Sequence, residues 1–272
     1  MLPDPIIQFT LFGKELKIYM YGVCIAVGIL VCLAVFYFYT KKKLMPDKLQ
    51  DFIFIVAIIA IALGFLAAKL YQAIYEWIEK GVFDFYNSGI TAMGGFIGGA
   101  AAFIITYFVG GKFVFKGNDK GLHIKEFNKV LLCAPCCITI AHAFGRLGCL
   151  CAGCCHGAFI SHKAGHGGLY MRSDGMWGYY VPTQLYEALF LFVLFAVLSY
   201  LYFNRCNIIM QIYLIAYGAW RIFIEFFRTD ARGAAILGLY PSQWQSVIFI
   251  AGGVIMLLIY IFKKIPLKLP KE

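Results

Sequence analysis

The sequence predicts an all-α integral membrane protein, built as a bundle of seven transmembrane helices. Of its 272 residues, 62% are hydrophobic and only 14% are charged. Soluble domains contain about 45–50% apolar and about 25% charged residues, so this composition excludes an ordinary soluble domain. The apolar residues are also gathered into long runs, which are separated by charged, proline-containing or glycine-rich segments.

Each of these runs has the length that a membrane helix needs. A helix that crosses the hydrocarbon core of about 30 Å takes about 20 apolar residues. Segments such as KKKLMPDK and KKIPLKLPKE end the runs. No internal repeat or long linker divides the chain, so we expect one polytopic membrane domain over residues 1–272. The predicted spans are 17–40, 52–75, 90–110, 127–148, 182–203, 207–227 and 242–262.

The basic residues of the loops predict which side faces the cytoplasm. The loops at 41–48, 112–129, 205 and 263–271 contain fourteen lysines and arginines, and the opposite set contains about six. Cytoplasmic loops carry the excess of these residues, so the N-terminus is predicted outside and the C-terminus inside. The longest loop, 149–181, then faces outward.

The same distribution bears on partners and processing. The net charge of +10 is divided among short clusters between apolar runs, which suits an orientation signal and predicts no nucleic-acid partner. The opening residues MLPDPIIQFTLFGKELK have neither a basic n-region nor a small-residue cleavage site, so we expect no signal peptide.

Five ionisable side chains lie within or at the ends of predicted spans, where charges are costly and usually functional: Lys69, Arg146, Glu187, Arg221 and Glu225. Lys69 can also reach water from the end of its span. Arg221 and Glu225 are four residues apart in AYGAWRIFIEFFR, so they share a helix face and can neutralise each other in part. Both arginines are predicted near the outer-leaflet phosphates, and a guanidinium binds phosphate through two parallel hydrogen bonds.

Two Cys-x-x-Cys pairs resemble a zinc ribbon, Cys133 with Cys136 and Cys151 with Cys154. The helix predicted over 127–148 runs between the pairs and separates them by roughly 27 Å, so one ion cannot bind both. We therefore expect the first pair, and Cys137 beside it, to be buried apolar residues.

The motif GRLGCLCAGCCHG at 145–157 leaves three states open for its thiols. Cys149, Cys151, Cys154, Cys155 and His156 could supply four zinc ligands. Two of the cysteines could form a disulfide, because the outer side of a bacterial membrane is oxidising. The thiols could also be free and line a pocket.

Six motifs, in order along nearly the whole chain, resemble the prolipoprotein diacylglyceryl transferase family. They are YMYGVCIAVG at 19–28, AMGGFIGG at 92–99, GRLGCLCAGCCHG at 145–157, PTQLYEAL at 182–189, YGAWRIFIEFFRTD at 217–230 and YPSQWQS at 240–246. The resemblance implies an enzyme of the bacterial inner membrane that needs no metal or cofactor. It implies transfer of the diacylglyceryl group of phosphatidylglycerol to the lipobox cysteine thiol of a preprolipoprotein, with release of glycerol phosphate.

The resemblance also implies residue roles. Arg146 matches the arginine that binds the lipid phosphate, Arg221 and Glu225 match an essential arginine and glutamate, and Tyr21 matches a first-helix tyrosine. The matching glycines, expected at the substrate, are Gly145, Gly148, Gly153 and Gly157.

This chain departs from the family at four polar positions. Met93 and Val181 stand where the family has histidines, Cys149 replaces an asparagine, and Cys154 replaces an acidic residue. Of these, Met93, Cys149 and Cys154 are expected to contact substrate. The remaining candidates for a general base are His142 and His156. We favour His142, because it lies one helical turn before Arg146 on the same face.

Two other functions stay open at this point. The transferase scaffold could serve a thiol-redox or zinc-binding protein, or the chain could bind or transport lipid without catalysis.

Overall fold

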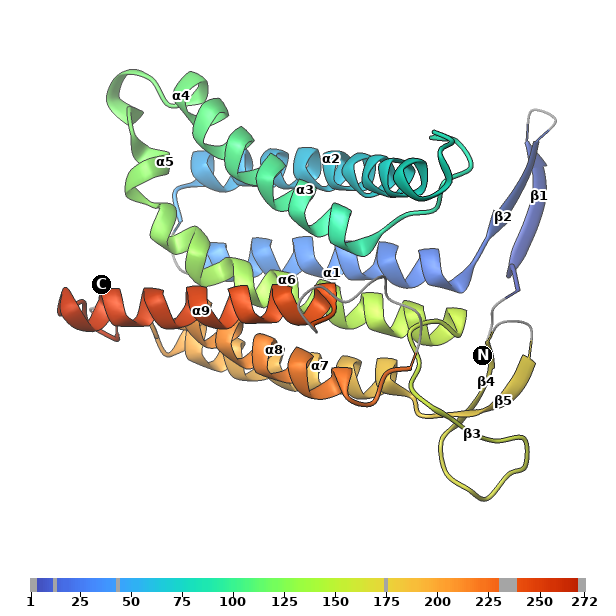
Figure 1. The fold of residues 1–272 in the computed structure, drawn as a ribbon. Helices are drawn as coiled ribbons and strands as arrows, with labels where there is room; N and C mark the ends of the chain where they lie inside the picture. The colour runs from blue at the N-terminus through green and yellow to red at the C-terminus, as the bar shows by residue number, and fades with distance from the viewer. Residues whose placement is uncertain (1–3, 12–13, 43–44, 174–175, 230–238, 269–272) are drawn as a thin grey trace. The chain divides into compact units, whose positions relative to one another are not determined.

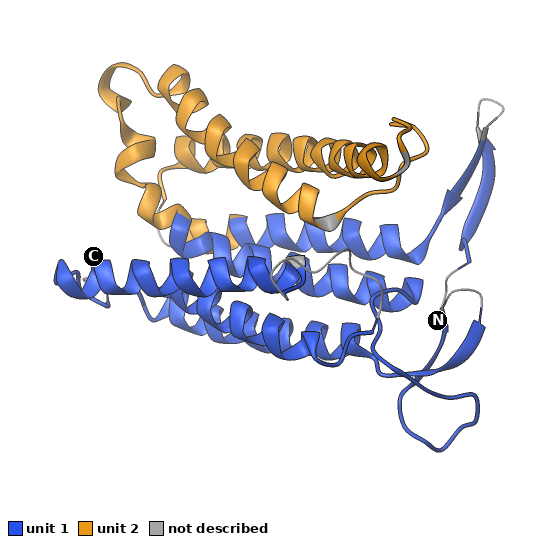
Figure 2. Cartoon of the chain, in the orientation of Figure 1, with its two compact units in different colours: residues 1–36, 131–272 blue, residues 37–130 orange. Residues whose placement is uncertain are grey.

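The computed structural model of the chain is dominated by long helices (Figure 1). It describes residues 4–11, 14–42, 45–173, 176–229 and 239–268. Three cations that entered the sidedness prediction, Lys43, Arg232 and Lys271, lie outside the described residues. The chain forms two compact units, one of residues 1–36 and 131–272 and one of residues 37–130 (Figure 2).

Among the described residues, six helices are long and apolar enough to cross a membrane, so the chain is a multi-pass membrane protein. A seventh predicted span, 207–227, contains helix α8 (Ile209–Glu225), which has 17 residues and is shorter than the others. The six spans lie in α1 (Met20–Lys42), α2 (Asp47–Lys80), the run from α3 (Ala92–Ile105) to α4 (Gly111–Val114), α6 (Phe127–Ala152), α7 (Thr183–Phe203) and α9 (Pro241–Phe262).

Within residues 37–130, α2 packs closely on α3 through small residues. A side chain added at Gly98 would put its Cβ 2.2 Å from Ala67 Cβ, and one at Gly94 would reach Tyr71. A π-helical turn (Thr106–Gly110) continues α3 into α4, and two short helices follow, η2 (Gly117–Asp119) and α5 (Leu122–Lys125). The glycines of AMGGFIGG therefore serve helix packing.

Lys69 has a structural contact in the same unit. Its ammonium group donates to the carbonyl oxygens of Tyr86 (3.1 Å) and Ser88 (3.0 Å) and lies over the ring of Phe85. These bonds fix the segment between α2 and α3 and account for a cation at the end of a span.

In the other unit, α7, α8 and α9 run side by side (Figure 1). Leu191 and Leu198 of α7 and Ile209 and Ile224 of α8 are almost completely buried and form part of its core. Gly218 of α8 touches Ile250 and the carbonyl oxygen of Ser246, so α8 and α9 approach closely.

The prediction of a helical membrane protein is confirmed, but its all-α form is wrong, because two small antiparallel sheets occur among the described residues. Strand β1 (Ile7–Leu11) pairs with β2 (Lys14–Ile18), and a second sheet has the order β3 (Phe159–Ser161), β5 (Met176–Tyr180), β4 (Leu169–Ser173). Neither sheet contributes a large core, and strands of three to five residues give only a weak alternating pattern.

The prediction that Cys133, Cys136 and Cys137 are buried apolar residues is confirmed. Cys133, Cys136 and Cys137 of α6 are all buried, with exposures of 1%, 0% and 7%. The sulfur atoms of Cys133 and Cys137 are 3.8 Å apart, one helical turn from each other. They are apolar core residues, and the length of α6 separates them from the thiols at its end and in the loop that follows.

Candidate active site

A buried carboxylate, Glu187 of α7, stands at the centre of the charged groups in the unit formed by 1–36 and 131–272. Its Oε2 is 3.0 Å from Nε of Arg146, on α6. Its Oε1 accepts a hydrogen bond from the Tyr217 hydroxyl of α8 (3.2 Å) and lies 3.9 Å from Nε2 of His142. Because Glu187 is only 1% exposed, this cluster of side chains holds its charge away from solvent.

Helix α8 brings a second ion pair to the same place. Nη2 of Arg221 is 3.1 Å from Oε2 of Glu225, as the four-residue spacing predicts. The other oxygen of Glu225 accepts a hydrogen bond from Ser242 (2.9 Å), in the first turn of α9. Arg221 and Glu225 are 8% and 5% exposed, and Arg221 is close enough to Glu187 for their charges to interact.

Arg221 keeps one donor group without a partner. Its Nη1 is buried and makes no hydrogen bond within the described residues. A buried guanidinium N–H without an acceptor is costly, so this group favours an anion that accepts from it.

The start of α7 holds the loop that follows α6. Thr183 Oγ1 donates to the carbonyl oxygen of Cys155 (2.8 Å), and Gln184 Nε2 donates to that of Cys154 (2.7 Å). Both polar side chains are 1% exposed. One turn further along α7 is Glu187, so a single helix end positions both the loop and Arg146.

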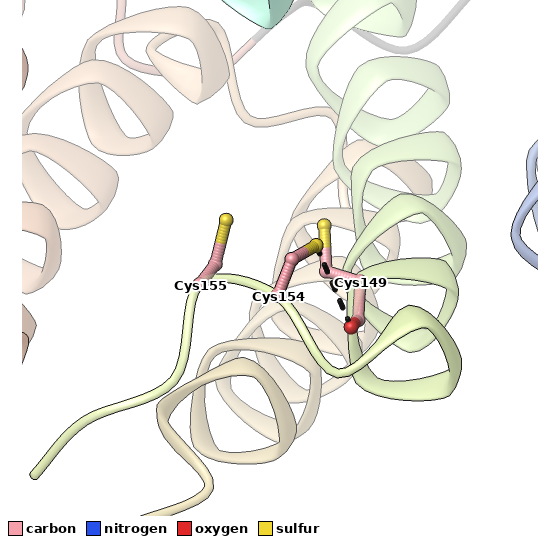
Figure 3. A group of neighbouring side chains, drawn as sticks. All are labelled: Cys149, Cys154 and Cys155. Atoms are coloured by element: carbon pink, nitrogen blue, oxygen red, sulfur yellow. Dashed lines mark hydrogen bonds between the residues drawn. The ribbon is translucent and has the colours of Figure 1, made fainter. Parts of the chain in front are cut away.

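Three thiols come together in this loop. The sulfur atoms of Cys149, Cys154 and Cys155 lie within 4.8 Å of one another, and the side chains stand beside each other on the same side of the backbone (Figure 3). The Cys149 and Cys154 thiols lower the pKa of Cys155 below its usual value by hydrogen bonding, and the charges of Arg228 and Arg146 act in the same direction.

Protein packing explains three of the four predicted glycines. Gly153 has a φ of 73°, in the left-handed region, and a Cβ there would lie 2.2 Å from the carbonyl oxygen of Arg172. A Cβ at Gly157 would lie 2.3 Å from that of Phe227, and one at Gly148 would meet Tyr21. Gly145 is different, because a Cβ there meets nothing within 4 Å. It leaves open space beside Arg146.

Two other predicted residues come from α1 and α3. Tyr21, in the first turn of α1, packs on Gly148 and is 42% exposed. Met93 is in α3 and belongs to the unit of residues 37–130. The structure therefore brings together His142, Arg146 and Arg221, which predictions from sequence had named, with Glu225 beside them.

Comparison with known proteins identifies the family. Residues 7–259 match the sequence profile of the prolipoprotein diacylglyceryl transferases. This chain belongs to that family. It is 30% identical to phosphatidylglycerol–prolipoprotein diacylglyceryl transferase 2 of Clostridium perfringens over 92% of this chain and 93% of that protein. It is 32% identical to the Clostridium tetani transferase (95% and 98% covered) and 31% identical to that of Streptococcus pneumoniae (94% and 95%).

Sequence reasoning assigned no role to two residues that this family member places at the centre of its charged cluster. The sequence identifies Glu187 only as a charge within a predicted span, and a charge in that position is sufficient to make it a candidate for the functional site. Tyr217 resembles any other aromatic residue of an apolar helix. Its role as a donor becomes visible only when α8 is placed beside α7.

The central position of Glu187 generates a stability prediction. We expect Glu187→Ala to lower the free energy of unfolding by about 3–5 kcal/mol, because it leaves the buried Arg146 charge without its partner. The matched control is Glu15→Ala, which removes an exposed carboxylate 3.6 Å from Lys17 and should change stability little. Denaturant titration in detergent micelles measures both. Equal stability of the two variants would contradict the central role of Glu187.

Proposed function

We propose that this chain transfers the diacylglyceryl group of phosphatidylglycerol to the lipobox cysteine thiol of a preprolipoprotein and releases glycerol phosphate. The observation that carries the proposal is the pair of buried arginines, Arg146 and Arg221, which approach one carboxylate from two helices. Their arrangement suits a phosphate group, and the names of the relatives state this substrate and this acceptor.

The reaction needs negative charge to be stabilised on the leaving group. The acceptor sulfur attacks the glyceryl carbon, the carbon–oxygen bond to phosphate breaks, and its electron pair leaves with the phosphate. Arg221 offers a buried N–H that has no other acceptor among the described residues. Donors fixed in advance at the site of developing charge are often the largest contribution to catalysis.

The remaining residues serve this step in distinct ways. Glu225 holds the Arg221 guanidinium, and Arg146 binds the phosphate beside the open space at Gly145. Tyr21 and the backbone at Gly148, Gly153 and Gly157 line the substrate site together with Cys149 and Cys154. His142 accepts the proton of the acceptor thiol.

We further propose one polytopic domain of seven spans in the bacterial plasma membrane, with the N-terminus outside. Helix α8 supplies the seventh span, because it packs between α7 and α9 and its 17 residues extend about 25 Å. Only five residues join α7 to α8, as expected for antiparallel neighbours.

Reporter fusions test this topology. A reporter fused after residue 165 should be active outside the cell, and one fused after residue 118 should be active in the cytoplasm, because the basic loops stay inside. The opposite pattern would overturn the orientation and the outward position of the loop after α6.

Substitution of the arginines tests phosphate recognition. Arg146→Ala and Arg221→Ala should each slow transfer of labelled diacylglyceryl to a lipobox peptide by roughly 30- to 150-fold, since a charge-assisted hydrogen bond is worth about 2–3 kcal/mol. Lysine at either position should restore little of the transfer rate, because it lacks the planar pair of N–H donors that a guanidinium offers to phosphate. Arg172→Ala, which removes an exposed cation 3.7 Å from Asp4, is the control and should keep the rate.

A rate near that of the unaltered protein in either lysine variant would contradict bidentate recognition. Retained membrane insertion, followed in the same preparations, separates lost catalysis from lost folding.

The proposed base predicts a pH dependence. General-base loss costs about 10²–10⁴-fold, and a free thiol with a pKa of about 8.5 ionises without help at high pH. We therefore expect His142→Gln to reduce transfer at least tenfold at pH 7 and much less at pH 9. His156→Gln is the control, because the Nδ1 of His156 lies 2.8 Å from the carbonyl oxygen of Gly157 in the loop. Unchanged rates in both variants would contradict the assignment of His142 as the base.

A further inference from the structure

The loop after α6 contains a group of thiols to which the proposed reaction gives no chemical role. Cys149 lies in the last turn of α6. The backbone then reverses at two residues in the left-handed conformation, Gly153 (φ 73°) and Cys155 (φ 61°). The reversal returns Cys154 and Cys155 to Cys149, so three sulfur atoms lie within 4.8 Å of one another (Figure 3). A left-handed backbone is unfavourable for a residue with a side chain. At Cys155 this conformation places the thiol beside those of Cys149 and Cys154.

The loop is held in this shape by α7. The carbonyl oxygens of Cys154 and Cys155 accept hydrogen bonds from the buried side chains of Gln184 and Thr183. The amide of Cys154 donates to the carbonyl oxygen of Cys149 (3.2 Å). The three thiols are therefore positioned before any ligand binds, as a ligand site requires.

The spacing of the sulfur atoms is close to that of a metal site. A zinc–sulfur bond of about 2.3 Å in tetrahedral geometry places sulfur atoms about 3.8 Å apart. The sulfur–sulfur separations here exceed this by at most about 1 Å, which small side-chain rotations can close. Thiolates are soft ligands and favour Zn²⁺ over Mg²⁺ or Ca²⁺.

We propose that Cys149, Cys154 and Cys155 bind one Zn²⁺ through three thiolates, and that the acceptor thiol of the preprolipoprotein takes the fourth position. The site is particular to this chain and departs from the metal-free enzyme that the family resemblance implies, because Cys149 and Cys154 stand where the family has an asparagine and an acidic residue. This inference rests on the proposed function, because the substrate supplies the fourth ligand. Three protein ligands and one exchangeable position distinguish catalytic zinc sites from structural sites with four. Cys154 is exposed, so the fourth position can be reached from outside the chain.

The charges around the group suit such a centre. Zn²⁺ with three thiolates carries one negative charge, and both Arg146 and Arg228 are near enough to act on Cys155. Cys151 takes no part, because its thiol interacts with Cys24 of α1 instead. It provides a matched control from the same short motif.

The site supplies what the acceptor thiol needs. Binding to the metal lowers the pKa of the thiol, so its proton leaves to the base and the sulfur stays as a thiolate. The sulfur then forms a bond to the glyceryl carbon, the carbon–oxygen bond to phosphate breaks, and the electron pair departs with glycerol phosphate. The thioether product is a weaker ligand than the thiolate, which favours its release.

Metal content of the full-length protein, purified in detergent without chelators, tests the site. We expect about one zinc per chain in the unaltered protein and in Cys151→Ser, and under about a tenth of this in Cys154→Ser and Cys155→Ser. Because a serine variant can fail to fold, zinc is also removed from the unaltered folded protein with a chelator and then restored. Restored binding at one equivalent supports the site.

Cobalt tests the fourth position without relying on turnover. Co²⁺ replaces Zn²⁺ in thiolate sites and gives a charge-transfer absorption that increases with the number of thiolates. Addition of a lipobox peptide with its cysteine should raise this absorption by about one third, from three thiolates to four. The same peptide with serine in place of cysteine should leave it unchanged.

The outcomes separate this inference from the proposed function. A protein that binds no zinc, or whose cysteines form a disulfide, and that still transfers diacylglyceryl overturns the metal site and leaves the function standing. A protein that binds one metal and the cysteine peptide but transfers nothing overturns the function and leaves the site standing.

Discussion

The site depends on the burial of one carboxylate, Glu187, against an arginine from another helix. Neither charge is tolerable alone in an apolar surrounding, so the pair restricts how α6 and α7 can lie relative to each other. The Tyr217 hydroxyl of α8 donates a hydrogen bond to the same carboxylate, so a third helix is joined to the pair. Three helices are thereby held at one level, and the packing of their apolar faces stabilises that arrangement without determining its register.

The charges of this site favour a particular kind of ligand. Among the described residues it contains the guanidinium groups of Arg146, Arg221 and Arg228 and the carboxylates of Glu187 and Glu225, which leaves one excess positive charge. A phosphodiester carries one negative charge and balances it. In the proposed reaction the leaving phosphate gains further negative charge as its bond to the glyceryl carbon breaks, and the same arginines would then interact with it more strongly. Binding that strengthens toward the transition state is the binding that accelerates a reaction.

Local features of the sequence predicted much of this arrangement, and long-range contacts explain the rest. The four-residue spacing of Arg221 and Glu225 predicts their ion pair, because residues four apart in a helix lie on the same face. Helix length likewise separated Cys133 from the later thiols. The partner of Arg146 lies 41 positions away on another helix, and no local rule selects Glu187. Neither the sheet within 149–181 nor the β1–β2 pair is predicted from the sequence, because their strands are too short for a clear alternation of apolar and polar residues.

The first turn of α7 links the two halves of the chemistry. Thr183 and Gln184 hold the backbone of the loop that carries Cys154 and Cys155, and Glu187, one turn later, holds Arg146, the proposed phosphate ligand. Because a helix turn is rigid, the thiol loop and Arg146 must move together if α7 shifts. Transfer requires the acceptor sulfur and the phosphate to meet across one carbon atom, where an error of about 1 Å is costly in rate. In the proposed reaction a single helix end positions the groups that bind both reactants, which gives a reason for the burial of Thr183, Gln184 and Glu187.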